Sequence, residues 1–251
     1  MEPDEYARMF ALEESHWWYR ALRRNIHQAL TRAGALTRPT STVSPTGLDA
    51  GCGTGMLLAT WGESVHGLGL DFSAAALAGA RRRGLRRLMR ASVEAIPLRS
   101  GGLDLIVSAD VLYHRGVRDD VAALREFQRC LRPGGVLVLN LPAFDWLRSS
   151  HDAAIHTARR YTAGEIRAKL RRAGFSPLRV RYWNWLLFPP IALVRLARRR
   201  PRPGAHAPVS DLAPVAPGLN ALLNALLALE ARLAFVPAPA GLSILAVARK
   251  E

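Results

Sequence analysis

The chain has 251 residues, enough for one large domain or for one domain with an appendage, and its 49% hydrophobic and 22% charged residues indicate a globular protein. The net charge of +15 does not by itself indicate a nucleic-acid partner, because of the 35 basic residues only Lys169 and Lys250 are lysine. Such an arginine bias is typical of a GC-rich genome, and it leaves open a basic face toward an anionic membrane or a phosphorylated substrate.

The cysteines and the N-terminus predict a cytoplasmic location. Cys52 and Cys130 are the only cysteines, too few for a disulfide framework or a zinc site, which favours a reducing compartment. The first five residues are acidic and contain no apolar run, so no signal peptide is expected.

Strands and helices are predicted to alternate along the chain. Apolar residues at helical spacing predict a helix over 4–33, and a polar, proline-containing connector follows over 37–46. The predicted strands are the run into Asp49 and residues 65–70, 85–91, 103–109, 136–141, 175–183 and 241–248. The predicted helices between them are 56–61, 73–84, 117–131 and 162–173. This alternation is typical of a parallel sheet covered on both faces.

A glycine-rich turn lies where the first strand is predicted to end. Asp49 closes an apolar run, and Gly51, Gly53 and Gly55 follow at alternate positions around Cys52. Without a Cβ, glycine permits unusual dihedral angles and lets a ligand lie against the main chain at the positive end of a helix. The third glycine comes one residue too early for the dinucleotide pattern G-x-G-x-x-G. The alternatives are a nucleotide-binding turn and a plain tight turn.

A second acidic residue, Asp71, ends the next predicted strand. A carboxylate there is suited to accept hydrogen bonds from both ribose hydroxyls of a nucleoside ligand. The alternative role is that of a helix N-terminal acid just before Ser73. The glycine turn upstream favours the nucleoside, and the neighbouring Phe72 is expected at the same site.

The glycine turn resembles motif I of the class I S-adenosylmethionine (SAM) methyltransferases. Residues 91–98 are similar to a family segment in which an aspartate binds the adenine amino group and the next backbone N–H contacts the ring. Here Ser92 stands in place of the aspartate, a departure from the family pattern, and Val93 and Glu94 follow it. The backbone of Val93 and the Ser92 hydroxyl are expected to serve the adenine instead.

Residues 104–114 resemble motif IV of the same family, in which backbone carbonyls, here around Ser108 and Ala109, accept hydrogen bonds from the methionine ammonium group. Residues 131–135, before the fifth strand, complete the family order. The resemblance implies a Rossmann-like class I methyltransferase fold: an α/β protein with a seven-stranded, mostly parallel sheet and helices on both faces. The implied parts are an N-terminal helical cap (1–36), a SAM-binding core (43–182), a helical insertion (183–236) and a closing strand (237–251).

An aromatic segment near the N-terminus adds a further expectation. Residues 14–20 contain Trp18, Tyr19 and Arg20, and quinone-type relatives carry a comparable Trp-Trp and arginine element that folds over the cofactor. The resemblance implies that Arg20 pairs with the cofactor carboxylate and that Tyr19 stacks nearby. The alternative is an amphipathic core helix whose tryptophans only pack.

Three histidines are candidates for a general base. His114 ends the motif IV segment at the expected rim of the cofactor pocket, whereas His151 and His156 lie in a polar insertion over 143–161. Histidine suits proton removal near neutral pH, although a lone histidine is more often structural. Asp110 and the residues after the fifth strand do not form a convincing ligand set, so no metal is expected.

The segment 183–236 has two alternative roles. Residues 183–194 are apolar and precede several arginines, but they are too short and too proline-rich to span a bilayer. With the leucine-rich residues 219–236 they are expected to form a lid or packed core, or else to contact a membrane surface peripherally.

The leading hypothesis is a SAM-dependent methyltransferase that acts on a small, apolar or lipid-like molecule, with oxygen as the favoured acceptor. S-adenosylhomocysteine (SAH) would be the product, and no nucleic-acid partner is expected. The first alternative is a methyltransferase for a membrane-bound quinone, polyprenyl or glycolipid intermediate. The second is a catalytically silent SAM-binding scaffold, which only Ser92 favours.

Overall fold

Strands and helices alternate along the computed structural model, which describes residues 3–36, 43–197 and 213–251. The strands are β1 (Thr46–Ala50), β2 (His66–Asp71), β3 (Leu88–Arg90), β4 (Leu103–Ala109), β5 (Leu131–Pro142), β6 (Phe175–Trp183) and β7 (Ser243–Lys250). The helices are α1 (Pro3–Leu12), α2 (Trp17–Arg32), α3 (Met56–Ala59), α4 (Ala74–Arg82), α5 (Asp120–Cys130), α6 (Ser150–Ala154), α7 (Ala163–Arg172), α8 (Phe188–Ala197) and α9 (Pro217–Arg232), with a short 3-10 helix η1 (Asp145–Leu147).

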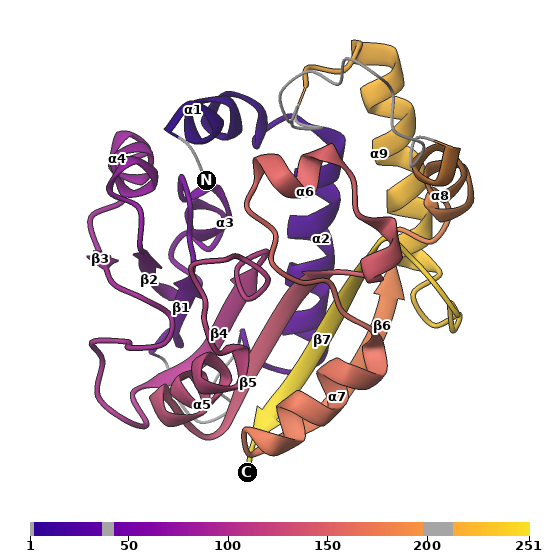
Figure 1. Ribbon diagram of the computed structural model, residues 1–251. Helices are drawn as coiled ribbons and strands as arrows, with labels where there is room; N and C mark the ends of the chain where they lie inside the picture. Colours follow the sequence, from indigo (N-terminus) through magenta and orange to yellow (C-terminus); the bar gives the residue numbers. More distant parts are fainter. Residues whose placement is uncertain (1–2, 37–42, 198–212) are drawn as a thin grey trace.

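The strands form one seven-stranded sheet in the order β3-β2-β1-β4-β5-β7-β6 (Figure 1). β1 to β5 pair in parallel, whereas β7 runs antiparallel to both β5 and β6. The winding reverses between β1 and β4, and ligands of open α/β sheets bind beyond the strand ends at such a point. The mostly parallel, seven-stranded α/β fold predicted from the sequence is confirmed.

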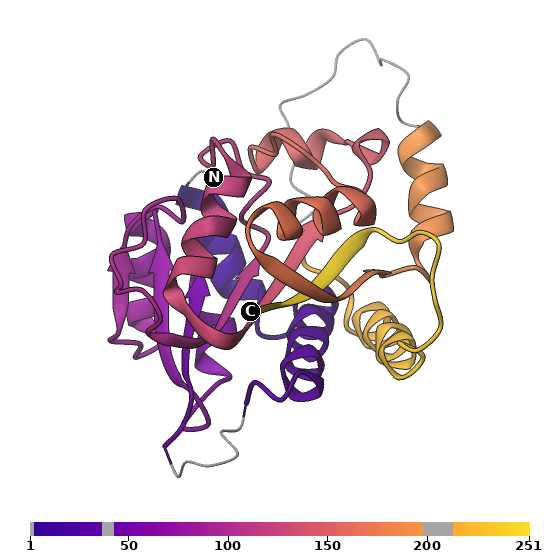
Figure 2. The same cartoon turned by 90° about the horizontal axis from the view of Figure 1, so that it is seen from below.

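Helices cover both faces of the sheet (Figure 2), because residues of the central strands alternate between two apolar cores. On one face, Ile106 of β4 and Leu137 of β5 pack with residues of α5 and α7. On the other face, Leu105 and Val138 pack with residues of α2, α3 and α9. The strands are buried from both sides, which explains their nearly continuous apolar sequences.

The single helix predicted over 4–33 is wrong, since the structure has α1 and α2 with a break between them. His16 has extended backbone dihedrals at the break, and its ring accepts a hydrogen bond from the Trp18 N–H, which caps α2. Glu13, in the same break, turns toward the glycine turn and accepts hydrogen bonds from the Thr54 hydroxyl and from Arg83, the latter at 2.8 Å. The hydrogen bonds of Glu13 therefore hold α1 over the turn between β1 and α3.

The two helices of segment 183–236 have different surroundings. α9 packs along α2, where the Trp17 N–H donates to Asn220 at 2.8 Å. α8 contacts η1, and the Arg195 guanidinium donates to the Leu147 carbonyl at 2.8 Å. Residues 198–200 and most of the proline-rich stretch 201–217 lie outside the described residues. None of the helices in the described ranges is long and apolar enough to cross a membrane.

Asp120 fastens the polar insertion to α5. Its carboxylate accepts hydrogen bonds from the Tyr161 hydroxyl at 2.9 Å and from Lys169 at 2.8 Å, and Arg159 lies 3.4 Å away. Burial opposes ionisation, but these donors outweigh it and hold the pKa of Asp120 below its usual value.

Asp120→Asn is therefore expected to lower the free energy of unfolding by about 1–2 kcal/mol at pH 7. Because the folded-state pKa is depressed, this stabilisation is present above the unfolded pKa and is lost as the pH falls through the folded pKa. Urea unfolding at pH 7 and pH 3 checks the sign, since the gap between variant and wild type should close at the lower pH. A gap of equal size at both values would contradict the assignment.

Candidate functional site

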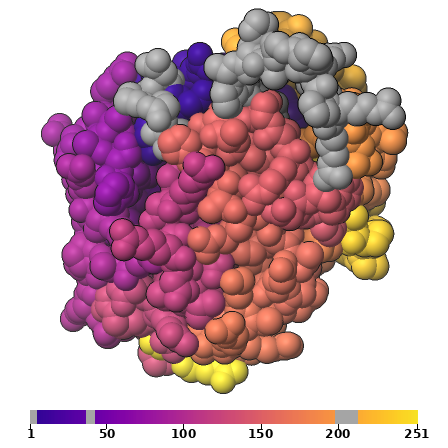
Figure 3. Space-filling view, in the orientation of Figure 1, coloured from indigo at the N-terminus to yellow at the C-terminus, as the bar shows by residue number. Residues whose placement is uncertain are grey.

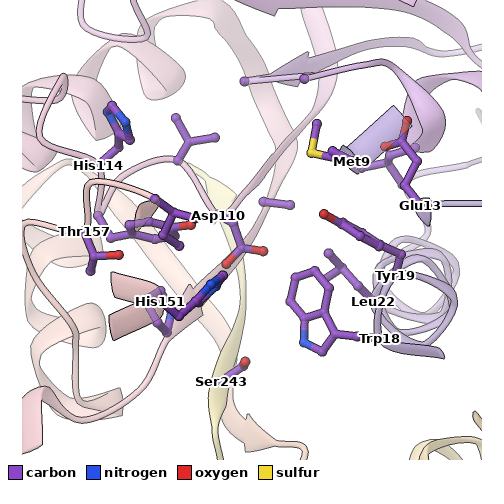
Figure 4. Close-up of a pocket in the computed structure, with 18 of the residues that line it drawn as sticks. Met9, Glu13, Trp18, Tyr19, Leu22, Asp110, His114, His151, Thr157 and Ser243 are labelled. Carbon is purple, nitrogen blue, oxygen red and sulfur yellow. The ribbon is translucent and has the colours of Figure 1, made fainter. Parts of the chain in front are cut away.

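A cavity of about 1210 Å³ lies at the carboxyl ends of the parallel strands (Figure 4). Its walls come from α1 and α2, from the turns after β1, β2 and β4, from insertion 143–161 and from α8. Figures 1 and 3 show the N-terminal helices, in indigo, and the insertion, in salmon, at the same end of the molecule. Segments far apart in the sequence thus enclose one space.

Most of the residues proposed from the sequence line this cavity. They are Trp18, Tyr19, Asp49, Gly51, Cys52, Gly53, Asp71, Phe72, Ser92, Val93, Ala109, His114 and His151. The structure brings them together because each follows a parallel strand or faces the strand ends from a covering segment. Arg20, Gly55, Glu94, Ser108 and His156 do not line it.

Arg20 points away from the cavity, contrary to the sequence-based expectation. It is exposed, whereas Arg23 lines the cavity wall. In a helix, residues four apart share a face, so Tyr19 and Arg23 point the same way and Arg20 is rotated by about 100°. The Arg23 guanidinium donates to the carbonyls of Glu13 and Glu14.

Three further predicted residues serve the local structure instead of the cavity wall. The Ser108 hydroxyl donates to the Ala50 carbonyl at 2.9 Å and joins β4 to β1. Glu94 accepts from the backbone N–H groups of Arg118 and Asp119, which orders the loop before α5. Gly55 begins α3 at φ +85°, and a Cβ there would lie 2.4 Å from the Leu85 side chain.

The three histidines occupy different positions. His114 lines the cavity, and its Nδ1 accepts from the Gly116 N–H at 2.9 Å. Burial lowers the pKa of His114 to about 4, so its ring is neutral at pH 7. His151 lines the same cavity from α6, whereas His156 lies behind His114 with the two rings stacked at 5.7 Å. His156 is therefore not placed to reach a ligand in the cavity.

The end of the cavity nearest β1 and β2 gathers acidic groups. Asp71 accepts from the backbone N–H groups of Gly53 at 2.9 Å and Ser73 at 2.8 Å, which hold its carboxylate over the glycine turn. Asp49 is buried beside it, and burial together with the charges of Asp71 and Glu13 raises the pKa of Asp49 to about 8. Burial also raises the pKa values of Asp71 and Glu13. Carboxyl groups in this arrangement favour a cationic ligand that carries hydroxyls.

Asp110 is a cavity residue that the sequence-based site did not include. It follows β4 with φ +61°, and its carboxylate accepts from the Asn140 side-chain amide at 2.9 Å. Burial raises the pKa of Asp110 to about 7, although the Asn140 hydrogen bond and the Arg160 charge oppose that rise. Its position at the carboxyl end of a central parallel strand was the signal that could have identified it.

The end of the cavity nearest the insertion has polar and apolar walls. Arg148, Arg160 and Arg195 line it, and Arg160 forms a bidentate ion pair with Asp152 at 2.7 and 3.0 Å. The Thr157 hydroxyl is buried there without a hydrogen-bond partner among the described residues. Pro190, Ile191, Val194 and Leu242 supply the apolar wall.

Another residue that lines the cavity has a buried polar atom without a partner in the described part of the chain. It is the Oδ1 of Asn184, a residue held at φ +59° after β6. No three His, Cys, Asp or Glu side chains among the described residues are grouped to hold a metal ion.

SAM fits the acidic end of the cavity by the chemistry of the groups present. SAM carries an adenosine, an amino-acid tail and a positively charged sulfonium. Asp71 would hold the ribose hydroxyls, and the turn at Gly51–Gly53 would face the amino-acid tail. Ser92 and Val93 line the side where the adenine would lie.

Known methyltransferase sequences resemble part of this chain. A family model described as a methyltransferase domain matches residues 48–139. The malonyl-[acyl-carrier protein] O-methyltransferase of Enterobacter lignolyticus is 41% identical over 103 residues, which cover 40% of each chain. The trans-aconitate 2-methyltransferase of Azoarcus sp. is 31% identical over 155 residues, 58% of this chain and 56% of the relative. The chain thus spans between two-fifths and just over half of these relatives.

Solved structures share the fold at low identity. One is a SAM-dependent methyltransferase of Thermotoga maritima, described as a possible histamine N-methyltransferase. It superposes with a TM-score of 0.59 at 18% identity over 99% of this chain and 96% of its own. Motif order, matched domain and sheet topology agree: residues 48–139 form a methyltransferase domain within a fold of the class I methyltransferase type.

Proposed function

We propose that this protein transfers a methyl group from SAM to an oxygen atom of a small, mainly apolar acceptor. The observation that carries this proposal is one continuous cavity with two chemically different ends. Its volume of about 1210 Å³ exceeds the roughly 300–1,000 Å³ typical of a pocket for one small ligand. There is room for SAM at the acidic end and for an acceptor beside the insertion and α8.

The walls near the insertion support an acceptor with an apolar body and a polar group. Ile191 and Val194 of α8 offer apolar contact, whereas Thr157 Oγ1 and Asn184 Oδ1 offer buried polar atoms that no described residue satisfies. These atoms have almost no exposed surface in the empty cavity, so an acceptor would reach them only after the side chains turn, and the hydrogen bond would then remove their desolvation penalty. Because α8 lines this space, the apolar segment after β6 acts as a cover over the acceptor.

The methyl group moves by in-line displacement. The acceptor oxygen forms a bond to the methyl carbon while the S–CH₃ bond breaks, and the electron pair of that bond stays on sulfur. The walls supply alignment and exclude water, which accounts for much of the rate of such a transfer. A carboxylate acceptor needs no base, and the malonyl and trans-aconitate groups in the names of two relatives both contain carboxylates.

A hydroxyl acceptor would need a base, and His114 is the histidine best placed for that role. It lines the cavity, and it is neutral at pH 7. Its low pKa makes it a weaker base than an unperturbed histidine.

The carboxylate of SAM would pair with Arg23, which lies on the same face of α2 as Tyr19.

Methyl-labelled SAM tests the proposed function. The protein is incubated with labelled SAM and a small-molecule cell extract, and we expect the label in an organic-soluble product. Release of the label by mild alkali would identify an ester, and resistance would identify an ether. His114→Ala should reduce labelling at least tenfold for a hydroxyl acceptor and little for a carboxylate. Intact SAM binding with no labelled small molecule, or with label on protein or nucleic acid, would contradict the proposal.

A membrane-bound acceptor is the second candidate, favoured by the outer surface of α8. Leu193, Val194 and Leu196 are 68, 49 and 43% exposed, and Val194 also lines the cavity. Apolar side chains at the cavity mouth would suit a lipid-like acceptor drawn from a bilayer. Flotation with anionic liposomes should decrease in a Leu193→Glu, Leu196→Glu double variant. Equal flotation of variant and wild type would exclude α8 as the contact.

Thr157→Val is expected to stabilise the empty protein by about 1 kcal/mol, because it removes a buried hydroxyl that no described residue satisfies. Urea unfolding measures the change. Thr54→Val is the matched control, since the buried Thr54 hydroxyl donates to Glu13 and its loss should destabilise by about 1–3 kcal/mol. Destabilisation of both variants by the same amount would contradict the assignment of Thr157 to ligand contact.

A further inference from the structure

Asp110 holds a backbone conformation that few side chains adopt. Its φ of +61° lies in the left-handed region, which aspartate and asparagine tolerate better than other non-glycine residues. Its N–H donates to the Asn140 carbonyl at 2.9 Å, so pairing with β5 holds the residue at this angle. The chain turns sharply there, directly after β4, and directs the Asp110 side chain into the cavity.

A chain of two hydrogen bonds fixes the direction of the Asp110 carboxylate. The Trp183 indole N–H donates to Asn140 Oδ1 at 2.8 Å, and Asn140 Nδ2 donates to Asp110 Oδ2 at 2.9 Å. An indole nitrogen only donates, so it determines which end of the Asn140 amide faces Asp110. Asn140 and Trp183 are both fully buried. The network extends from β6 through β5 to the cavity wall.

The carboxylate stands between the two ends of the cavity. In Figure 4 it faces Tyr19 and Trp18 of α2 across the cavity, with His114 and His151 on its own side. The next residue, Val111, packs against the glycine turn so closely that a Cβ on Gly51 would lie 2.1 Å from it. Asp110 is therefore adjacent to the turn that would hold the amino-acid tail of SAM, on the side toward the acceptor.

The surroundings of Asp110 leave its negative charge incompletely balanced. Arg160 is the cation that acts on it, and Arg160 is already paired with Asp152. Asn140 donates one neutral hydrogen bond. Other titratable groups near the carboxylate include Tyr19 of α2, Tyr113 and His114 of its own turn, and His151 of α6.

We propose that Asp110 supplies the negative charge that attracts the sulfonium of SAM and thereby distinguishes SAM from SAH. This inference rests on the proposed function, because it takes the ligand of the acidic end to be SAM. Methyl transfer removes the positive charge from sulfur, so Asp110 loses its attraction for the product at that moment. Asp110 would thus favour binding of the reactant and release of the product without contacting the acceptor.

Calorimetric titration of SAM and of SAH, each over pH 6.0–8.5, tests this role. The ratio of the SAM affinity to the SAH affinity reports the effect of the sulfonium, since both ligands share the adenosine, the ammonium and the carboxylate. In the wild type, we expect SAM to bind about tenfold more tightly than SAH at pH 8. Because the ionised carboxylate attracts the cation, this preference should fall as the pH drops below about 7.

Asp110→Asn is the decisive variant. Asparagine tolerates a φ of +61°, and its side-chain oxygen can accept the hydrogen bond from Asn140. We expect SAM affinity at pH 8 to fall about tenfold, SAH affinity to change less than twofold, and the ratio to become independent of pH. Glu63→Gln, which neutralises an exposed carboxylate away from the cavity, is the matched control and should behave as the wild type.

Trp183→Phe provides a second variant that keeps the carboxyl group. It removes the indole N–H that orients Asn140, and we expect a smaller but pH-dependent loss of the SAM preference. Equal losses of SAM and SAH affinity in Asp110→Asn would overturn the inference, as would a pH-dependent ratio that persists in that variant. Failure of the wild type to bind either ligand would refute the proposed function itself, which separates the two outcomes.

Discussion

Gly51→Ala is expected to weaken SAM binding at least 100-fold. Gly51 has φ +89°, and a Cβ on it would lie 2.1 Å from Val111 Cγ2, so the variant strains the backbone and also displaces a neighbour. The two effects together are expected to lower the free energy of unfolding by about 2–4 kcal/mol. Calorimetry with SAM and urea unfolding measure both losses. With an alanine side chain at position 51, the turn after β1 can no longer keep its backbone conformation beside Val111, which follows β4.

Gly84→Ala separates strain from crowding. Gly84 has a similar φ of +83°, but a Cβ there would meet no atom within 4 Å, and the residue lies outside the cavity. This variant should lose about 1–2 kcal/mol of stability and keep wild-type affinity for SAM. Equal SAM affinity in Gly51→Ala and Gly84→Ala would show that the glycine turn does not hold the ligand.

Asp49→Asn is expected to lower SAM affinity at least tenfold and yet to stabilise the empty protein at pH 8. Burial and the neighbouring carboxyl groups raise the pKa of Asp49 from its ordinary 3.8 to about 8. At a pH between 3.8 and about 8, the Asp49 carboxyl is protonated in the folded protein but ionised in the unfolded chain. The free energy of unfolding therefore decreases as the pH rises through this range. An asparagine at this position does not titrate. At pH 8 the free energy of unfolding of the variant should therefore exceed that of the wild type by on the order of 2 kcal/mol.

Urea unfolding at pH 5, 6.5 and 8 checks the sign of this effect. The stability difference between Asp49→Asn and the wild type should grow steadily with pH. Glu63→Gln again serves as control, because its carboxylate is exposed and should show no such trend. A difference that stays constant across the three pH values would contradict a raised pKa at Asp49.

The central strands were predictable because they are buried from both sides. Strand β4 matches its predicted range residue for residue, since a parallel, doubly covered strand is a nearly continuous apolar run with clear ends. The edge strand β6, which is antiparallel to β7, also matches its predicted range. The boundary between α1 and α2 was not predictable in this way. Apolar residues keep helical spacing on both sides of residues 13–16, and the break is defined by the His16 cap and by the contacts of Glu13 with Thr54 and Arg83.

The residues that line the acidic end of the cavity were also largely predictable. Asp49, Gly51, Asp71 and Val93 lie near the ends of parallel strands, and such ends meet at one edge of the sheet in any fold of this class. Arg20 is exposed and does not line the cavity, for a geometric reason. The aromatic segment was recognised, but the helix phase that points Arg23 and not Arg20 into the cavity depends on how α2 packs.

Local periodicity and the residues at strand ends were sufficient to predict the sheet, its covering helices and the glycine turn. Tertiary structure alone decided the rest of the cavity. Asp110, Asn140 and Trp183 are distant in sequence and become a network only when β4, β5 and β6 come together, and Thr157 and Asn184 face one space for the same reason. Hydrogen bonds between segments far apart in the sequence produce no periodic pattern in it. The residues that surround the acceptor could therefore be identified only from the folded structure.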